Sequence, residues 1–183
     1  MAVSGTTAMK ERAVDRLRIG PAAAAALAVF AVSAATLGGA WYFQFVLGYQ
    51  PCHLCLEQRI PYYVIVPLAL VTAIAAAVRA PARLVAAGLA IIVLAALCSA
   101  ALGAYHAGVE WHWWEGPTEC SGGVSDLTAK GPLLDQIRAI RVVPCNEAAW
   151  RLFGLSLAGY NVLISLALAA IACCGLFAGR RPT

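Results

Sequence analysis

Four long apolar runs constrain the fold of this 183-residue chain more than any other feature. They extend from about Pro21 to Val46, Ile60 to Val78, Leu84 to Ala107 and Leu152 to Phe177. As a helix rising about 1.5 Å per residue, each run can cross a hydrocarbon core of roughly 30 Å. None alternates with a period of two, and 12% charged residues cannot cover a water-soluble surface. The runs therefore predict an all-α polytopic membrane protein, a bundle of four transmembrane helices.

The basic residues predict how the chain lies across the membrane. Eight of the thirteen lysines and arginines precede the first run, separate the second from the third, or follow the fourth, and only two acidic residues accompany them. The other side carries five basic and seven acidic residues. Because basic loops stay in the cytoplasm, we expect both termini there. A net charge of +4, segregated in this way, argues against nucleic-acid binding.

This topology divides the chain into three parts. We expect a cytoplasmic tail over residues 1–20, a transmembrane domain over 21–178 with outer loops 47–59 and 108–151, and a cytoplasmic tail over 179–183. A cleaved signal peptide is the alternative for the first run. Apolar character continues through Phe45, longer than a typical signal core, so a retained span is favoured.

The second outer loop carries two patterned segments. Trp111, Trp113 and Trp114 form an aromatic cluster that favours an interfacial anchor over a recognition patch. Residues 133–141 place their apolar side chains near one helical face and are flanked by prolines. That pattern predicts a short amphipathic helix lying on the membrane.

Two cysteine pairs lie in the outer loops. Cys52 and Cys55 form a Cys-x-x-Cys motif, and Cys120 and Cys145 lie 25 residues apart in the second loop. In an oxidising compartment such pairs are redox-active, structural or half of a metal site. The wide second spacing does not match a zinc ribbon, and Leu56 stands where a c-type haem motif needs histidine. We therefore expect a redox function and no metal, because a helix start and a nearby cation both favour a thiolate.

Arg59 and His106 are the candidate partners of this chemistry. Arg59 lies four residues after Cys55, one helical turn away, where it can stabilise a thiolate or a reduced quinone oxygen; a snorkelling anchor is the alternative. His106 ends the third run, where a backbone contact and a quinone oxygen are equally open partners. The three other cysteines lie within the spans and are expected to be small buried hydrophobes: Cys98, Cys173 and Cys174.

The segment Pro51 to Arg59 (PCHLCLEQR) resembles the Pro-Cys-x-x-Cys-x-x-x-Arg signature of the disulfide bond formation protein B (DsbB) family. The four spans, the second cysteine pair before the last span and the histidine ending the third also match, over roughly Trp41 to Tyr160. The resemblance implies a multi-pass protein of the bacterial inner membrane, with its redox loops in the periplasm. It also implies bound ubiquinone or menaquinone and a soluble periplasmic partner, a DsbA-like thioredoxin-fold oxidase that the protein reoxidises.

The same resemblance implies a role for each site residue. Cys120 would accept the partner's thiolate, and the displaced Cys145 would attack Cys52. Cys55 would then be freed beside the quinone, with Arg59 assisting and His106 also at the cofactor. Two alternatives stay open, a paralogue dedicated to one substrate and a non-catalytic, disulfide-stapled membrane assembly factor. The loop around Trp111 departs from the best-known members, which leaves the partner's identity open.

Overall fold

The computed structural model describes residues 20–117 and 144–178. Within them, four helices are long and apolar enough to cross a membrane, which confirms the predicted all-α, four-span class. The elements in chain order are α2 (Pro21–Phe45), α3 (His53–Glu57), α4 (Ile60–Ala77), α5 (Ala82–Glu110), β1 (Arg151–Leu152), β2 (Leu155–Ser156) and α7 (Leu157–Ala178). The amphipathic helix predicted over residues 133–141 lies outside the described residues.

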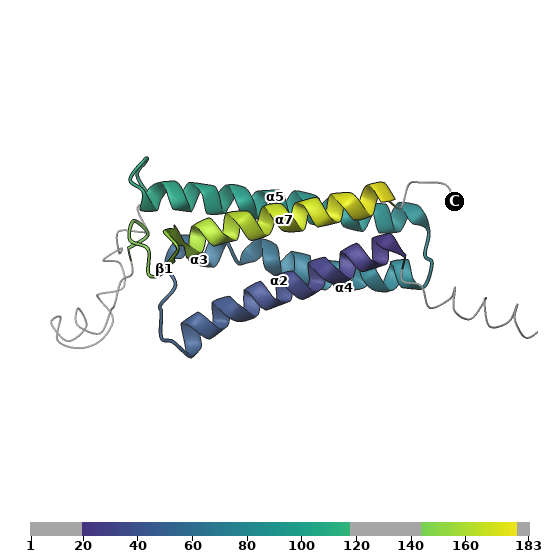
Figure 1. The fold of residues 1–183 in the computed structure, drawn as a ribbon, viewed down its shortest axis with the longest axis horizontal. Helices are drawn as coiled ribbons and strands as arrows, with labels where there is room; N and C mark the ends of the chain where they lie inside the picture. Colours follow the sequence, from purple (N-terminus) through teal and green to yellow (C-terminus); the bar gives the residue numbers. More distant parts are fainter. Residues whose placement is uncertain (1–19, 118–143, 179–183) are drawn as a thin grey trace, which may run out of the picture.

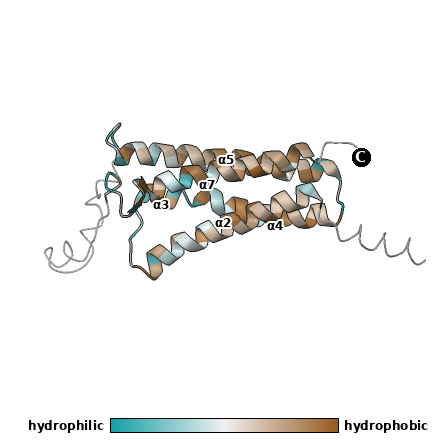
Figure 2. Cartoon of the chain, viewed as in Figure 1, coloured by the Kyte–Doolittle hydropathy of each residue, from teal (hydrophilic) through white to brown (hydrophobic). Residues whose placement is uncertain are grey.

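The four long helices form a closed bundle in which each packs against two others, in the order α2, α4, α5, α7 (Figure 1). The start of α2, the turn between α4 and α5, and the end of α7 lie together at one end. The opposite end carries Cys52, Cys55 and Cys145, and we call it the cysteine end. Apolar residues dominate the helices over most of their length (Figure 2), as expected for helices that face lipid on one side and a bundle core on the other.

Small residues line the interior of the bundle. Ala26, Ala69, Ala96 and Ala172 are fully buried, and a Cβ added to Gly175 would lie 2.6 Å from the Cβ of Ala25. Without a hydrophobic driving force in lipid, helices associate through such close packing. Larger side chains such as Ile65, Ile92 and Leu168 fill the rest of the core, and other leucines and valines are exposed on the outer surface, where lipid can surround them.

The prediction that the span cysteines are buried is wrong for two of them. Cys98 and Cys174 lie on the outer surface of the bundle, and Cys173 is half-buried. Cysteine is apolar enough to face lipid tails as readily as a protein core, so its position on the outer surface carries no penalty.

Two element boundaries differ from the sequence prediction by three residues or more, and the others agree within two. The third span continues past Ala107 to Glu110, which brings an acidic residue into the helix. The fourth helix begins at Leu157 rather than Leu152, because Arg151–Leu152 and Leu155–Ser156 pair as a two-stranded antiparallel hairpin. Gly154 has a φ of 81° at its turn, a conformation that glycine adopts at little cost.

The aromatic cluster folds back over the end of α5. The indole of Trp114 stacks on Tyr105 with ring centroids 6.0 Å apart, and its Nε1 donates to the carbonyl oxygen of Tyr105 at 2.9 Å. Trp111 and Trp113 contact each other edge-on and are substantially exposed. Their role as an interfacial anchor stays a prediction.

Candidate functional site: a buried dithiol beside an apolar cavity

The Cys-x-x-Cys pair lies at the start of a helix. Cys52 is the N-cap of α3, and its Sγ accepts a hydrogen bond from the backbone N–H of Cys55 at 3.3 Å. The two sulfur atoms lie 2.7 Å apart. Cys52 is only 6% exposed, whereas Cys55 is half-buried. Cys52 is therefore enclosed as a whole residue, whereas part of Cys55 remains exposed.

A cysteine from the second outer loop packs against this pair. Cys52, Leu54, Val109 and Cys145 form one buried cluster, with Cys55 against it. Cys145 is 1% exposed and disulfide-bonded, while the five other cysteines in the described ranges are free. Cys120 lies outside the described residues. The fold thus brings Cys145 and Cys52, which exchange directly in the predicted thiol relay, into one buried cluster.

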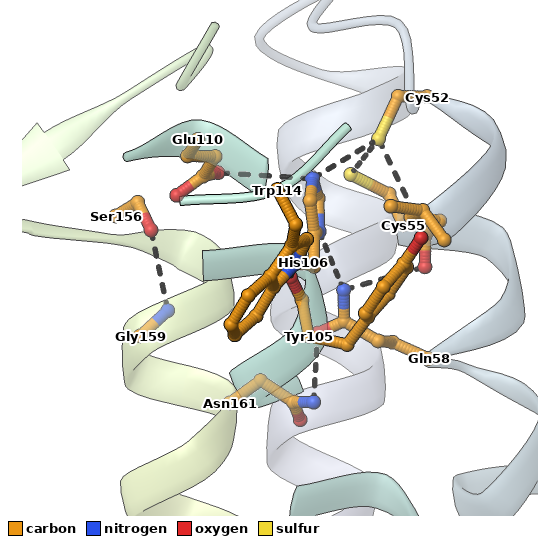
Figure 3. A network of polar contacts seen from close by, with 11 residues as sticks. Cys52, Cys55, Gln58, Tyr105, His106, Glu110, Trp114, Ser156, Gly159 and Asn161 are labelled. Atoms are coloured by element: carbon orange, nitrogen blue, oxygen red, sulfur yellow. Dashed lines mark hydrogen bonds and ion pairs between the residues drawn. The ribbon is translucent and has the colours of Figure 1, made fainter. Parts of the chain in front are cut away.

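His106 contacts the dithiol directly (Figure 3). Its Nε2 lies 3.6 Å from the Sγ of Cys52, and its Nδ1 lies 2.6 Å from the amide nitrogen of Gln58. Sequence reasoning left His106 open between a backbone contact and a quinone oxygen. The structure shows side-chain contacts to a cysteine and a glutamine, and His106 also lines the cavity described below.

Glu110 extends this group by one helical turn. Its Oε1 lies 3.8 Å from the Nε2 of His106, and both side chains are only 4% exposed. The other carboxylate oxygen, Oε2, is buried without a hydrogen-bond partner in the described part of the chain. Sequence reasoning missed Glu110 because it ended the span three residues earlier.

The environment of Cys52 favours its thiolate. The hydrogen bond from the Cys55 thiol lowers the pKa of Cys52, and a hydrogen bond from His106 adds to that effect. Burial acts in the opposite direction, and the resulting pKa of Cys52 is about 5. A reduced pair therefore carries its negative charge at Cys52 at neutral pH.

A mostly apolar cavity of about 260 Å³ lies beside the pair. Cys55 and Arg59 both line it, together with residues of α2 and α7 such as Phe43 and Ile164. The guanidinium of Arg59 donates to the side-chain oxygen of Gln44 and, at 3.3 Å, to the carbonyl oxygen of Ala40. These bonds hold the arginine against α2 at the edge of the cavity. Gln44 was not singled out from the sequence.

A polar network continues from His106 into the bundle. The Gln58 side-chain oxygen accepts from the Nδ2 of Asn161 at 2.8 Å, and the Oδ1 of Asn161 accepts from the hydroxyl of Tyr62 at 2.8 Å. Ser99 and Ser165 complete the network, with the hydroxyl of Ser165 donating to the hydroxyl oxygen of Ser99 at 3.0 Å. Sequence reasoning missed these residues. The available signal was Asn161, an amide within an apolar run, since polar residues inside membrane spans are rare and usually functional.

The site also contains a possible metal-ligand set. The ligand atoms of Cys52, Cys55 and His106 lie within 4.8 Å of one another, and sulfur and imidazole ligands suit zinc. A metal-bound histidine, however, normally donates its other ring N–H to an acceptor. Here the Nδ1 of His106 faces an amide nitrogen, which is a donor. The surroundings therefore do not match a metal ligand, and the absence of a metal stays a prediction.

These features together define a class of protein. A membrane bundle with a buried dithiol at one end, a disulfide-bonded cysteine packed on it and an apolar cavity alongside is an integral-membrane thiol–disulfide protein.

Comparison with known proteins agrees. The family model "Disulfide bond formation protein DsbB" matches residues 22–175. A disulfide bond formation protein B from Methylococcus capsulatus is 34% identical over 144 residues, covering 77% of this chain and 85% of its own. Another from Aromatoleum aromaticum is 31% identical over 159 residues, covering 85% of this chain and 92% of its own. The chain belongs to the DsbB family, a family of disulfide-forming oxidoreductases. No solved structure matches significantly.

Proposed function

We propose that this protein reoxidises a soluble, DsbA-like thioredoxin-fold dithiol oxidase and passes the electrons to a membrane quinone. One observation carries the proposal: the two cysteines of the dithiol have different neighbours. Cys52 packs with the disulfide-bonded Cys145, whereas Cys55 lines an apolar cavity together with Arg59. This arrangement supports thiol exchange on one side and electron transfer into a lipid-soluble acceptor on the other.

Cys120 and Cys145 carry out the first exchange in this proposal, starting from a disulfide between them. The partner's thiolate attacks Cys120, forming a mixed disulfide and releasing Cys145 as a thiolate. Cys145 then attacks Cys52, so a Cys52–Cys145 bond forms while the Cys52–Cys55 bond breaks and its electron pair stays on Cys55. The partner's second thiolate attacks the mixed disulfide, which releases oxidised partner and a Cys120 thiolate.

The second exchange restores the starting state. Cys120 attacks Cys145, re-forming their disulfide, and Cys52 leaves as a thiolate. A low pKa makes a thiol a better leaving group, and the pKa of Cys52 is lowered to about 5. Cys52 and Cys55 then close their own disulfide and give up two electrons. A bound quinone would accept these two electrons and take up two protons, giving the quinol. Each turnover thus converts one dithiol of the partner into a disulfide.

The cavity suits a quinone ring. A quinone head group is flat and apolar with two carbonyl acceptors, and the walls are mostly apolar with aromatic side chains such as Phe43 and Tyr160. Arginine has five N–H donors, and hydrogen bonds to Gln44 and Ala40 leave others for a carbonyl oxygen. Ubiquinone and menaquinone share this chemistry, so we propose either.

We also propose a location in a bacterial inner membrane. The asymmetry of the basic residues supports cytoplasmic termini, which would put the cysteine end on the periplasmic side. There it would meet both its soluble partner and an oxidising compartment.

A coupled turnover assay tests the proposal. Purified protein in detergent is mixed with a reduced DsbA-like partner and a titrated quinone, and partner oxidation and quinol formation are measured together. We expect one quinol for each partner disulfide, and a long-wavelength thiolate–quinone absorbance while Cys52 is bonded to Cys145 and Cys55 is a free thiolate. Cys55→Ser should abolish quinol formation, whereas Cys98→Ser, on the outer surface, should not.

The opposite result favours the alternative function. If neither ubiquinone nor menaquinone supports turnover while the wild-type cysteines still form their disulfides, the protein is a disulfide-stapled assembly factor.

A further inference from the structure

The two nitrogens of His106 face opposite kinds of hydrogen-bonding group (Figure 3). Nδ1 lies 2.6 Å from the amide nitrogen of Gln58, which can only donate. Nε2 faces two groups that accept when ionised, the sulfur of Cys52 at 3.6 Å and the carboxylate oxygen of Glu110 at 3.8 Å. A proton on Nε2 satisfies both sides, and a proton on Nδ1 would oppose another donor.

The orientation of the Gln58 amide decides this assignment, and backbone carbonyls fix it. The amide nitrogen of Gln58 also donates to the carbonyl oxygen of Leu54 at 3.3 Å. Its oxygen accepts from the Nδ2 of Asn161, and that same Nδ2 donates to the carbonyl oxygen of Ser99 at 3.2 Å. A backbone carbonyl can only accept, so turning either amide over would place two acceptors, or two donors, against each other.

We propose that Gln58 and Asn161 are positioning residues that hold His106 as the neutral tautomer with its proton on Nε2, directed at the sulfur of Cys52. Asn161 lies on α7, Gln58 joins α3 to α4, and His106 lies on α5, so the arrangement connects three parts of the bundle. The charged imidazolium would also carry a proton on Nδ1, facing the same amide donor.

This arrangement deepens the proposed function, on which it rests, because Cys52 there leaves as a thiolate. The Nε2–H donor stabilises that thiolate without adding a full positive charge next to Cys55. The titratable groups facing Cys52 in the described residues are Cys55 on α3 and His106 and Glu110 on α5. Arg151 of β1 interacts with Glu110 from the hairpin.

Nitrogen-15 NMR of ring-labelled histidine tests the tautomer directly. The full-length protein carries His53→Asn and His112→Asn, so that His106 gives the only signal. In the reduced protein in detergent at pH 7 we expect Nε2 to be protonated and Nδ1 to be bare. Gln58→Met keeps the side-chain length but removes the amide, and it should give a mixture of tautomers. Asn161→Leu should also give a mixture of tautomers, with a smaller share of the Nδ1-protonated form. The Gln58 amide stays in this variant, but it loses the hydrogen bond from Asn161 that orients it.

Ser165→Ala is the matched control. Ser165 belongs to the same network, bonded to Tyr62, Ser99 and, at 3.4 Å, the Oδ1 of Asn161. It is not bonded to the Nδ2 of Asn161, which anchors Gln58. It should leave the His106 spectrum unchanged. A second measurement is the pH at which Cys52 becomes half-reactive towards iodoacetamide. Gln58→Met should raise this pH by about one unit, the tenfold effect of one hydrogen bond to a charged group.

Three outcomes would overturn the proposal. They are a proton on Nδ1 in the wild type, protons on both nitrogens at pH 7, and an unaltered His106 spectrum in Gln58→Met. The NMR measurement needs neither quinone nor partner. If the turnover assay fails, the NMR result for His106 still holds. If the NMR result contradicts the proposed tautomer, the turnover assay still tests the proposed function on its own.

Discussion

A reduced Cys52 should react with alkylating reagents almost independently of pH between about 5 and 7. The hydrogen bond from Cys55 and the one from His106 lower the pKa of this thiol to about 5, although burial opposes them. At pH 7 such a thiol is about 99% ionised, and at pH 5 it is still about half ionised. An ordinary cysteine with a pKa near 8.5 is about 3% ionised at pH 7 and roughly 0.03% at pH 5.

The size of the effect depends on pH, because a thiolate of lower pKa is also a weaker nucleophile. With a Brønsted coefficient of about 0.4–0.5, a difference of about 3.5 pKa units lowers the reactivity of each thiolate roughly 25- to 55-fold. At pH 7 this loss cancels the gain in ionised fraction. At pH 5 the gain is roughly 1,600-fold, so Cys52 should react about 30- to 60-fold faster than an equally accessible ordinary cysteine.

The slope of the pH profile is the better measurement, because burial slows the absolute rate. The protein is reduced with a phosphine, exposed to iodoacetamide at each pH and digested, and alkylation at Cys52 is quantified by mass spectrometry. We expect the rate to rise about twofold from pH 5 to pH 7, against about a hundredfold for an ordinary thiol. Cys55→Ala should steepen the profile more than His106→Ala, because the Cys55 hydrogen bond is the larger cause. A hundredfold rise in the wild type would refute the reasoning.

Three further predictions concern quinone use, partner docking and topology. Arg59→Ala should raise the apparent KM for quinone about ten- to a hundredfold while cysteine exchange persists, and Gln44→Leu should do so less; an unchanged quinone titration would reduce Arg59 to a surface anchor. A partner lacking its resolving cysteine should be trapped on Cys120, as peptide mapping after non-reducing electrophoresis would show; an adduct that persists in Cys120→Ser reverses the assigned roles. In intact cells after reduction, a membrane-impermeant thiol reagent should label Cys120, and labelling of Cys173 or Cys174 would overturn the orientation.

The spans were predictable from sequence because membrane insertion depends on a local property. Hydropathy averaged over about twenty residues locates a span whatever its neighbours do. The face that each helix turns inward was less predictable. In lipid the outer face is as apolar as the inner one, so periodicity carries little information about burial. Cys98 and Cys174 show this: nothing in the sequence distinguished an outward cysteine from a buried one.

The dithiol was predictable as a motif, but its surroundings were not. Cys52 and Cys55 are three residues apart, and their place at a helix start follows from local sequence. Gln58 and Asn161 are 103 residues apart and meet only because the bundle brings the junction of α3 and α4 next to α7. Glu110 reached the site because α5 continues one turn beyond its last strongly apolar stretch, as helix boundaries are the least predictable feature of a helix.

The two sulfurs of the dithiol have different neighbours, and in the proposed cycle this sets the route of the electrons. Cys145 packs with Cys52 and is not among the residues that line the cavity in the described part of the chain. In this cycle electrons from the Cys145 thiolate therefore reach the acceptor through the Cys52–Cys55 disulfide. When Cys145 attacks Cys52, the electron pair of the broken bond goes to Cys55 at the cavity wall, where it can pass to the acceptor. In the later exchange Cys52 leaves Cys145 readily, because its thiolate is stabilised. If the environments of the two sulfurs were exchanged, the stabilised thiolate would lie at the cavity. The sulfur bonded to Cys145 would then be a poor leaving group.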